Sequence, residues 1–335
     1  MNRLLLLLCT LGLTASLFAQ EEAPPQGWQR GAGLGLDFSQ LLQINPKQGA
    51  GQNRLGFGGA ANYFANYRMD RRSWESTAMW QFGVQRLGTG IIAQGSDDRI
   101  PFQKAIDELR LNSKYGIQAS DSSKLFWTAN AGFLSQVTPT YQFPDLYPGN
   151  FISDFVDSGV TPLSKFLAPA TLTFSVGIDY KANENFSIFF SPISSKFIIV
   201  ADDVIASRGV HGNPVSGTPN EDGIYADFEN VDAQLGALAQ MKYADKFASD
   251  KATFTSTLNL YTNYLRNPEN VDLDWVNALG YELFKNFQLN LLLNVFYDDD
   301  VLVQITDYDE PNGVRGLGKR VSITQQLLLT YSRTF

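Results

Sequence analysis

The sequence predicts an all-β fold, a transmembrane antiparallel β-barrel of about 12 strands with short periplasmic turns and long extracellular loops. Three observations lead to it. Apolar residues alternate with polar or small residues in one segment after another. The connections between these segments are alternately long and short. No stretch after residue 20 holds 18 consecutive apolar residues, so a bundle of membrane-spanning helices is excluded.

The N-terminus has the pattern of a secretory signal peptide. Arg3 is followed by an apolar run that continues with few breaks to Phe18 and ends in Ala19-Gln20. We therefore expect a signal peptide at 1–20, a short periplasmic segment at 21–29 and an outer-membrane barrel at 30–335. A membrane anchor is the alternative, but the run is short and acidic, Pro-rich sequence follows at once. Cleavage would remove Cys9, the one cysteine of the chain.

Strict alternation identifies the strands. From Leu172 to Tyr180, every second residue is apolar and the residues between are Thr, Ser, Gly and Asp. Each strand is long enough to cross a bilayer at a tilt, which takes about 9–11 residues. The expected strands are 30–40, 54–68, 73–87, 107–118, 124–138, 168–181, 186–199, 230–243, 252–264, 271–284, 287–298 and 320–335.

The connections test this assignment independently. Those after the odd-numbered strands are 41–53, 88–106, 139–167, 200–229, 265–270 and 299–319, and all but one are long. Those after the even-numbered strands are 69–72, 119–123, 182–185, 244–251 and 285–286, and all are short. A soluble β-protein, the alternative, has no reason to alternate in this way, whereas outer-membrane barrels do. The even count places both termini in the periplasm.

The last strand indicates how the chain reaches its membrane. It ends in Phe335 after an alternating apolar series that includes Leu329 and Tyr331. It resembles the aromatic-terminated strand that bacterial assembly machinery reads. We expect an integral protein of the bacterial outer membrane whose partners are lipid, lipopolysaccharide and the barrel assembly machinery. A net charge of −8 argues against nucleic acid, and the oligomeric state is left open.

By alternation, several charged residues face the lumen. In a channel they set the preference for ions or solutes, and in a closed barrel they form ion pairs that fill the interior. Both alternatives stay open at this stage. The candidates are Glu75, Arg110, Lys114, Asp179, Asp232, Lys242, Asp272, Asp274 and Glu282.

Further chemistry is sparse. Carboxylates at the end of one expected strand and in the loop that follows it are candidate Ca²⁺ ligands, although charged loops are commonly just solvated. These are Asp298, Asp299, Asp300, Asp307 and Asp309. No other cofactor is expected, because a lone histidine and a lone cysteine cannot form a zinc cage. That histidine, His211, lies in a Gly- and Pro-containing loop, so we expect no catalytic triad and no enzyme.

Several stretches resemble an uncharacterised family of outer-membrane proteins from Bacteroidota, which is defined by sequence and not by function. They cover most of 30–335 and imply an exported barrel, but they transfer no site residue. The stretches are Gly49–Asn53, Ser113–Gly116, Leu163–Leu172, Val176–Lys181, Phe190–Lys196, Val200–Asp203, Asn270–Trp275 and Tyr297–Asp300.

The polar inward face makes a narrow channel for small polar solutes or ions the leading hypothesis. The alternative is a closed barrel that acts through its extracellular loops as a binding, adhesion or structural protein. Long loops at 139–167 and 200–229 motivate this alternative.

Overall fold

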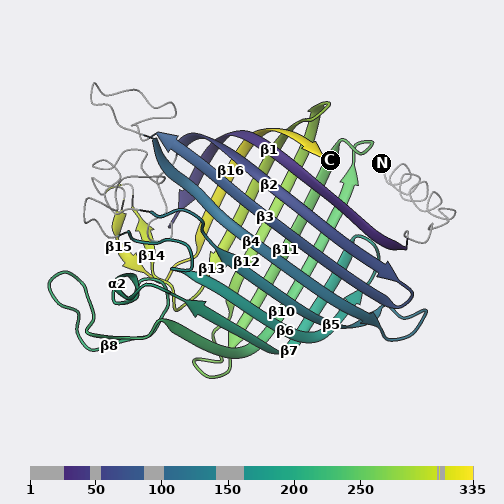
Figure 1. Ribbon diagram of the computed structural model, residues 1–335. Helices are drawn as coiled ribbons and strands as arrows, with labels where there is room; N and C mark the ends of the chain where they lie inside the picture. The colour runs from purple at the N-terminus through teal and green to yellow at the C-terminus, as the bar shows by residue number, and fades with distance from the viewer. Residues whose placement is uncertain are drawn as a thin grey trace, which may run out of the picture.

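The structure, a computed structural model, is a closed barrel of 12 antiparallel strands (Figure 1). It describes residues 26–45, 54–86, 102–140, 162–307, 309 and 314–334. The predicted signal peptide, most of segment 21–29 and Phe335 lie outside these residues. No helix of the described residues is long and apolar enough to span a membrane.

All of the predicted strands are confirmed. The wall consists of β1 Gly27–Ile44, β2 Arg54–Met69, β3 Arg72–Arg86, β4 Phe102–Gln118, β5 Leu125–Ser135, β6 Ala170–Lys181, β7 Phe186–Ile199, β10 Val231–Phe247, β11 Ala252–Asn263, β12 Asp272–Phe284, β13 Phe287–Tyr297 and β16 Ser322–Thr334. The largest difference is at β4, which begins at Phe102 instead of 107. A register shift in its pairing with β3, between Gly83 and Val84, breaks the alternation there.

The first and last strands close the barrel. β1 pairs with β2 on one side and with β16 on the other, from Gly33 opposite Thr334 to Ile44 opposite Ile323. Closure leaves no strand with a row of unpaired N–H and C=O groups, which a hydrocarbon environment would make very costly. The closed wall is therefore what allows this all-β chain to sit in a bilayer.

The alternating connections are also confirmed. At one end of the barrel β2 and β3 are joined by Asp70 and Arg71 alone, and β12 and β13 by Lys285 and Asn286. At the other end the connections 136–169, 200–230 and 298–321 are long. By the asymmetry of outer-membrane barrels, the short turns mark the periplasmic end and the long loops the extracellular end.

The two faces of the wall are the reverse of those in a soluble protein. On β6 the side chains of Phe174 and Val176 are 48% and 62% exposed, whereas Ser175 and Asp179 are 2% and 1% exposed. Apolar residues thus cover the outer face and polar residues are buried inside. This arrangement is stable only where lipid covers the outer face, so the barrel is of the outer-membrane type.

Small elements that alternation did not predict lie in the long loops. They are α2 Asp203–Ala206, β8 Val215–Ser216, β9 Asp227–Phe228, β14 Val303–Thr306 and β15 Val314–Gly318. Buried Ala168, Val200, Ile205 and Ala206 form a small core against which Phe228 packs. Because Ala168 belongs to the end of the connection 136–169 and the others to 200–230 or its border, segments 162–169 and 200–230 pack together as one unit, which we name the loop cap.

One glycine of the wall has a steric role that can be tested. A Cβ at Gly236 of β10 would lie 1.8 Å from the carbonyl oxygen of Thr262 on β11, where the register of β10 also shifts. A Cβ at Gly132 of β5 would meet nothing closer than 3.8 Å. We expect Gly236→Ala to lower the free energy of unfolding by about 1–3 kcal/mol.

The measurement is urea unfolding of the barrel folded into lipid vesicles. Gly132→Ala is the control and is expected to change stability by no more than about 0.5 kcal/mol. Equal effects of the two substitutions would contradict the steric argument.

Candidate functional site: the charged interior of the barrel

Ion pairs between distant strands identify the concave face. The Lys181 Nζ on β6 lies 2.9 Å from Oε1 of Glu75 on β3, although β4 and β5 lie between these strands. Along the wall three strand spacings amount to about 14 Å. Side chains on the convex side diverge, so this pair can form only across the interior.

Five charged side chains gather on this face toward the periplasmic turns. We name Glu75, Lys114, Asp179, Lys181 and Lys242 the inner cluster. Besides the Lys181–Glu75 pair, Lys114 Nζ lies 2.7 Å from Asp179 Oδ2, and these two side chains are 8% and 1% exposed. The ammonium groups of Lys114 and Lys181 also lie over the rings of Phe189 and Phe126, at 5.1 and 4.9 Å. This part of the interior is therefore densely packed.

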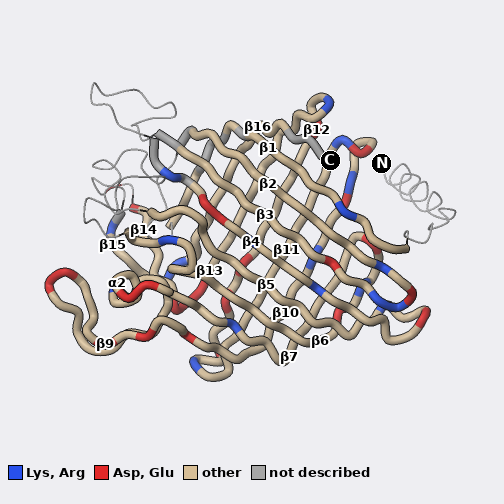
Figure 2. The backbone as a smooth tube through the Cα atoms, in the orientation of Figure 1, with Lys and Arg blue, Asp and Glu red and all other residues tan. Residues whose placement is uncertain are grey.

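A second group lies at the extracellular end. Lys196 on β7 donates to Asp272 and Asp298, at 3.3 and 3.4 Å, and thereby joins β7 to β12 and to the residue after β13, although β10 and β11 lie between. Arg266 donates to Asp232 at 2.6 Å. Figure 2 shows charged residues gathered toward the two ends of the barrel, with a largely uncharged wall between them.

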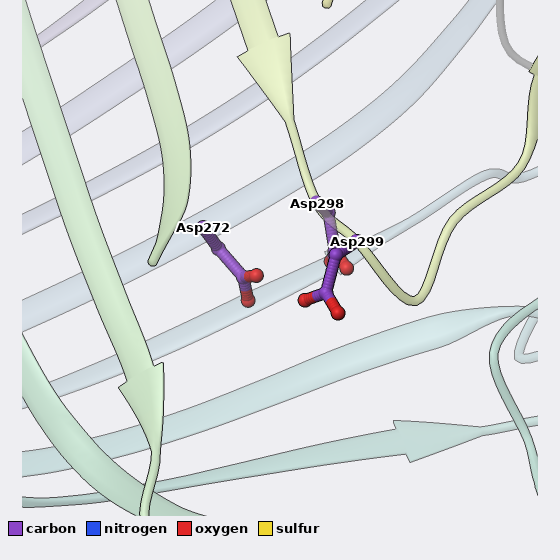
Figure 3. Close-up of side chains that lie close together, drawn as sticks. All are labelled: Asp272, Asp298 and Asp299. Atoms are coloured by element: carbon purple, nitrogen blue, oxygen red, sulfur yellow. The ribbon is translucent and has the colours of Figure 1, made fainter. Parts of the chain in front are cut away.

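The acidic residues of this end converge in part. Figure 3 shows the carboxylates of Asp272, Asp298 and Asp299 directed toward one another, and one ligand atom of each lies within 4.8 Å of the others. Asp300, Asp307 and Asp309 are not in this group. Lys196 contacts the first two carboxylates, while Lys319 and Asn270 contact Asp299. Calcium binding stays a prediction, and the structure gives these carboxylates protein partners.

The remaining candidates lie between or beyond the two groups. The pairing registers put Arg110, Asp274 and Glu282 on the same face as the clusters. Arg110 pairs with Glu108 at 2.9 Å and lies within electrostatic reach of Asp274. The structure thus places all nine candidates on the concave face, although their effect on solutes stays a prediction.

Sequence reasoning missed three basic partners of the lumen-facing candidates. Lys181 is the last residue of β6 and lies two positions after Asp179. Alternation therefore directs both side chains to the same face, so the sequence did indicate that Lys181 faces the lumen. Lys196 lies beyond a register shift of β7, and simple alternation from Ser187 would have directed it outward. Arg266 lies in a loop, where alternation gives no information.

One sector of the interior is open instead of packed. Asn62 and Phe64 on β2 and Thr77 on β3 are exposed, although the register directs them into the barrel. Phe64 lies flat against the wall because Gly31 has no side chain, and a Cβ there would be 2.5 Å from the ring. Across the interior, Ser175 and Ser194 are inaccessible and bond to each other at 2.7 Å.

The loop cap contacts the extracellular end of the barrel interior beside β7. A Cβ at Gly212 would lie 3.2 Å from Cδ1 of Ile198, an interior residue at the end of β7. Nε2 of His211 lies 2.8 Å from the carbonyl oxygen of Leu163 and ties the two loops together. Lys165 pairs with Asp202 at 2.5 Å between the same loops. The cap therefore narrows one side of the mouth.

Comparison with known proteins places the chain near proteins of unknown function. A family described as "Protein of unknown function (DUF3078)" matches residues 39–141, which confirms the resemblance to an uncharacterised family. No curated protein matches.

Three solved barrels are similar to the chain. An outer membrane channel from Pseudomonas putida F1 is 11% identical, with a TM-score of 0.41 over 94% of this chain and 100% of the other. The NanC porin is 9% identical, with a TM-score of 0.38 over 88% and 98%. The translocator domain of the autotransporter NalP from Neisseria meningitidis is 8% identical, with a TM-score of 0.37 over 92% and 90%.

The buried pair of the inner cluster gives a stability prediction. Asp179→Asn leaves the Lys114 ammonium without its carboxylate, and breaking a buried pair typically costs about 3–5 kcal/mol. The double variant Lys114→Met/Asp179→Asn removes both charges and is expected to recover much of the loss.

Urea unfolding in lipid vesicles measures these effects. Asp121→Asn is the control, because the Arg71–Asp121 pair is 45% and 93% exposed, and it should cost less than about 1 kcal/mol. A double variant that is less stable than the single variant would refute the role of the pair.

The loop cap gives a prediction for pH. Burial lowers the pKa of His211; its hydrogen bond to the Leu163 carbonyl opposes this shift, and the Arg208 guanidinium adds to it. Because the folded pKa lies below the unfolded value of about 6.5, the opened loop takes up a proton first. The packing of the cap therefore loses stability as the pH falls through and below that value.

Hydrogen exchange of the Ala201 amide, which donates to the Leu167 carbonyl, reports opening of the cap. Corrected for intrinsic rates, its protection should fall between about pH 7 and pH 5, and His211→Gln should remove this dependence. Protection that falls equally in both proteins would show that another group titrates.

Proposed function

We propose that the barrel is a narrow channel through which small polar solutes or ions cross the outer membrane. The observation that carries the proposal is the exposure of Asn62, Phe64 and Thr77 on the concave face. A side chain directed inward can be exposed only if free space adjoins it. The open sector beside β2 and β3 is therefore the path proposed for solutes.

The charged groups support a selective path. A solute that enters from outside first meets the acidic residues around Lys196 and then the inner cluster around Lys114. The inner cluster joins β6 to β3 across the interior, and the group around Lys196 joins β7 to β12 and to the end of β13, so both narrow the interior beside the open sector. Passage of small solutes and exclusion of large ones follow from this geometry.

A second candidate function is binding through the loop cap. Its own small core and its ties through His211 and Lys165 distinguish it from a simple solvated loop. In that case the barrel is an anchor and the cap contacts a partner at the cell surface. The channel is preferred, because a pure anchor has no need of an open sector.

We also propose that the chain is not an enzyme, since His211 is engaged with a carbonyl oxygen between two loops. The protein reaches the outer membrane after its predicted signal peptide is cleaved. Lipid and lipopolysaccharide cover the apolar outer face, and the assembly machinery reads the last strand, in which Leu329 and Tyr331 are outward-facing and exposed.

The test places a large ring in the open sector. Thr77→Trp directs an indole into the free space beside Phe64, whereas Ala78→Trp directs the same group from the next residue of β3 into lipid. Planar-bilayer recording should show discrete conductance steps for the unmodified protein. The steps should be smaller for Thr77→Trp and unchanged for Ala78→Trp.

Folding of each variant is checked by its heat-modifiable migration. A folded, unmodified protein that shows no steps under any salt condition would contradict the channel and favour the loop cap.

A further inference from the structure

Four hydrogen-bond donors form a cross-strand row inside the barrel. Register pairs Lys181 of β6 with Ser187 of β7, Ser187 with Lys242 of β10, and Lys242 with Thr257 of β11. Directly opposed residues on neighbouring strands have Cβ atoms about 4.5–5.5 Å apart. The row, which we name the donor row, therefore presents two ammonium groups and two hydroxyls along one short arc.

The donor row faces the interior. Lys181 is on the concave face because it reaches Glu75 across two intervening strands. Residues directly opposite one another in a sheet point to the same side, so the other three members share this orientation. The row lies near the periplasmic turns, since Lys181 and Ser187 flank the short connection 182–185.

Three members of the row have unused donors. In the part of the chain that the structure describes, no ion pair or hydrogen bond engages the side chains of Ser187, Lys242 or Thr257. All three are half-buried, not sealed, so a solute in the lumen can reach them. Lys242 thus differs from Lys114 and Lys181, each of which has a carboxylate partner.

The surrounding charge favours an anion. Lys242 lies within electrostatic reach of Lys114, Lys181, Glu75 and Asp179. The inner cluster therefore sets three ammonium groups against two carboxylates, both of which are already paired. Lys242 has no ion pair of its own among the described residues, so an anion in the lumen would balance its charge better than the two carboxylates that are already paired.

We propose that the donor row is a binding site for a small oxyanion, a carboxylate or a phosphate, on its way through the barrel. The Lys242 ammonium supplies the charge, and the Ser187 and Thr257 hydroxyls donate hydrogen bonds from either side. This inference rests on the proposed channel and names the class of solute: negatively charged molecules with exposed oxygen atoms.

The test combines two readouts on the folded barrel. Bilayer conductance in KCl is recorded while inorganic phosphate, acetate or uncharged glucose is added. Calorimetry measures phosphate binding separately, whether or not the barrel conducts. We expect phosphate and acetate, but not glucose, to reduce the current. Lys242→Gln should weaken phosphate binding by about tenfold, the equivalent of about 1.4 kcal/mol.

Matched variants isolate the site. Lys285→Gln removes the same charge from an exposed turn at the same end of the barrel and should leave phosphate binding unchanged. Lys242→Arg keeps the charge and should retain most of the binding. A structural role for Lys242 alone would predict loss of folding, which heat-modifiable migration detects, and not this pattern.

The outcomes separate the two proposals. Conductance steps with phosphate binding that is unaffected by Lys242→Gln would overturn the donor row and leave the channel standing. Phosphate binding that depends on Lys242 in a protein without conductance would support the donor row and overturn the channel. Phosphate and glucose acting alike would overturn the oxyanion site.

Discussion

Closure of the backbone hydrogen-bond network is the constraint on which the rest of this structure depends. In hydrocarbon each unpaired N–H or C=O costs several kcal/mol, so the pairing of β1 with β16 is as necessary as any hairpin in the wall. Once the wall closes, every second side chain must face lipid and must be apolar. Polar and charged residues of the strands are thereby confined to the concave face, where they meet residues from distant strands.

That confinement explains why the interior is unevenly filled. Ion pairs join β6 to β3 and β4, and β7 to β12 and to the end of β13, and Lys114 and Asp179 are almost inaccessible. Around β1 and β2 the interior positions include Gly31 and Gly33, over which Phe64 and Asn62 lie. Ion pairs thus hold part of the interior together, whereas the sector beside β2 and β3 leaves space. The proposed path and the proposed oxyanion site follow from this division.

Much of the fold could be predicted because the strands of a membrane barrel alternate between lipid-facing apolar residues and lumen-facing polar residues, a pattern with a period of two. The wall strands and the alternation of long and short connections were correct for this reason. The orientation of residues such as Lys114 and Asp272 followed from the same period. Register shifts destroy that information locally, which is why the strand start at Phe102 and the inward direction of Lys196 were missed. The packing of loop residues such as Arg266 and Ile205 depends on tertiary contacts that no period encodes.

Water access to the concave face is the central claim, and cysteine labelling tests it most directly. Without its predicted signal peptide the chain contains no cysteine, so each substitution is a unique label. Cysteines are placed one at a time from 75 to 81 on β3 in the membrane-embedded protein and treated with a charged, water-soluble thiol reagent. The account predicts reaction at the odd-numbered, inward-facing positions, most rapidly at 77, and protection at 76, 78 and 80. Protection at every position would mean a sealed interior and would contradict the channel.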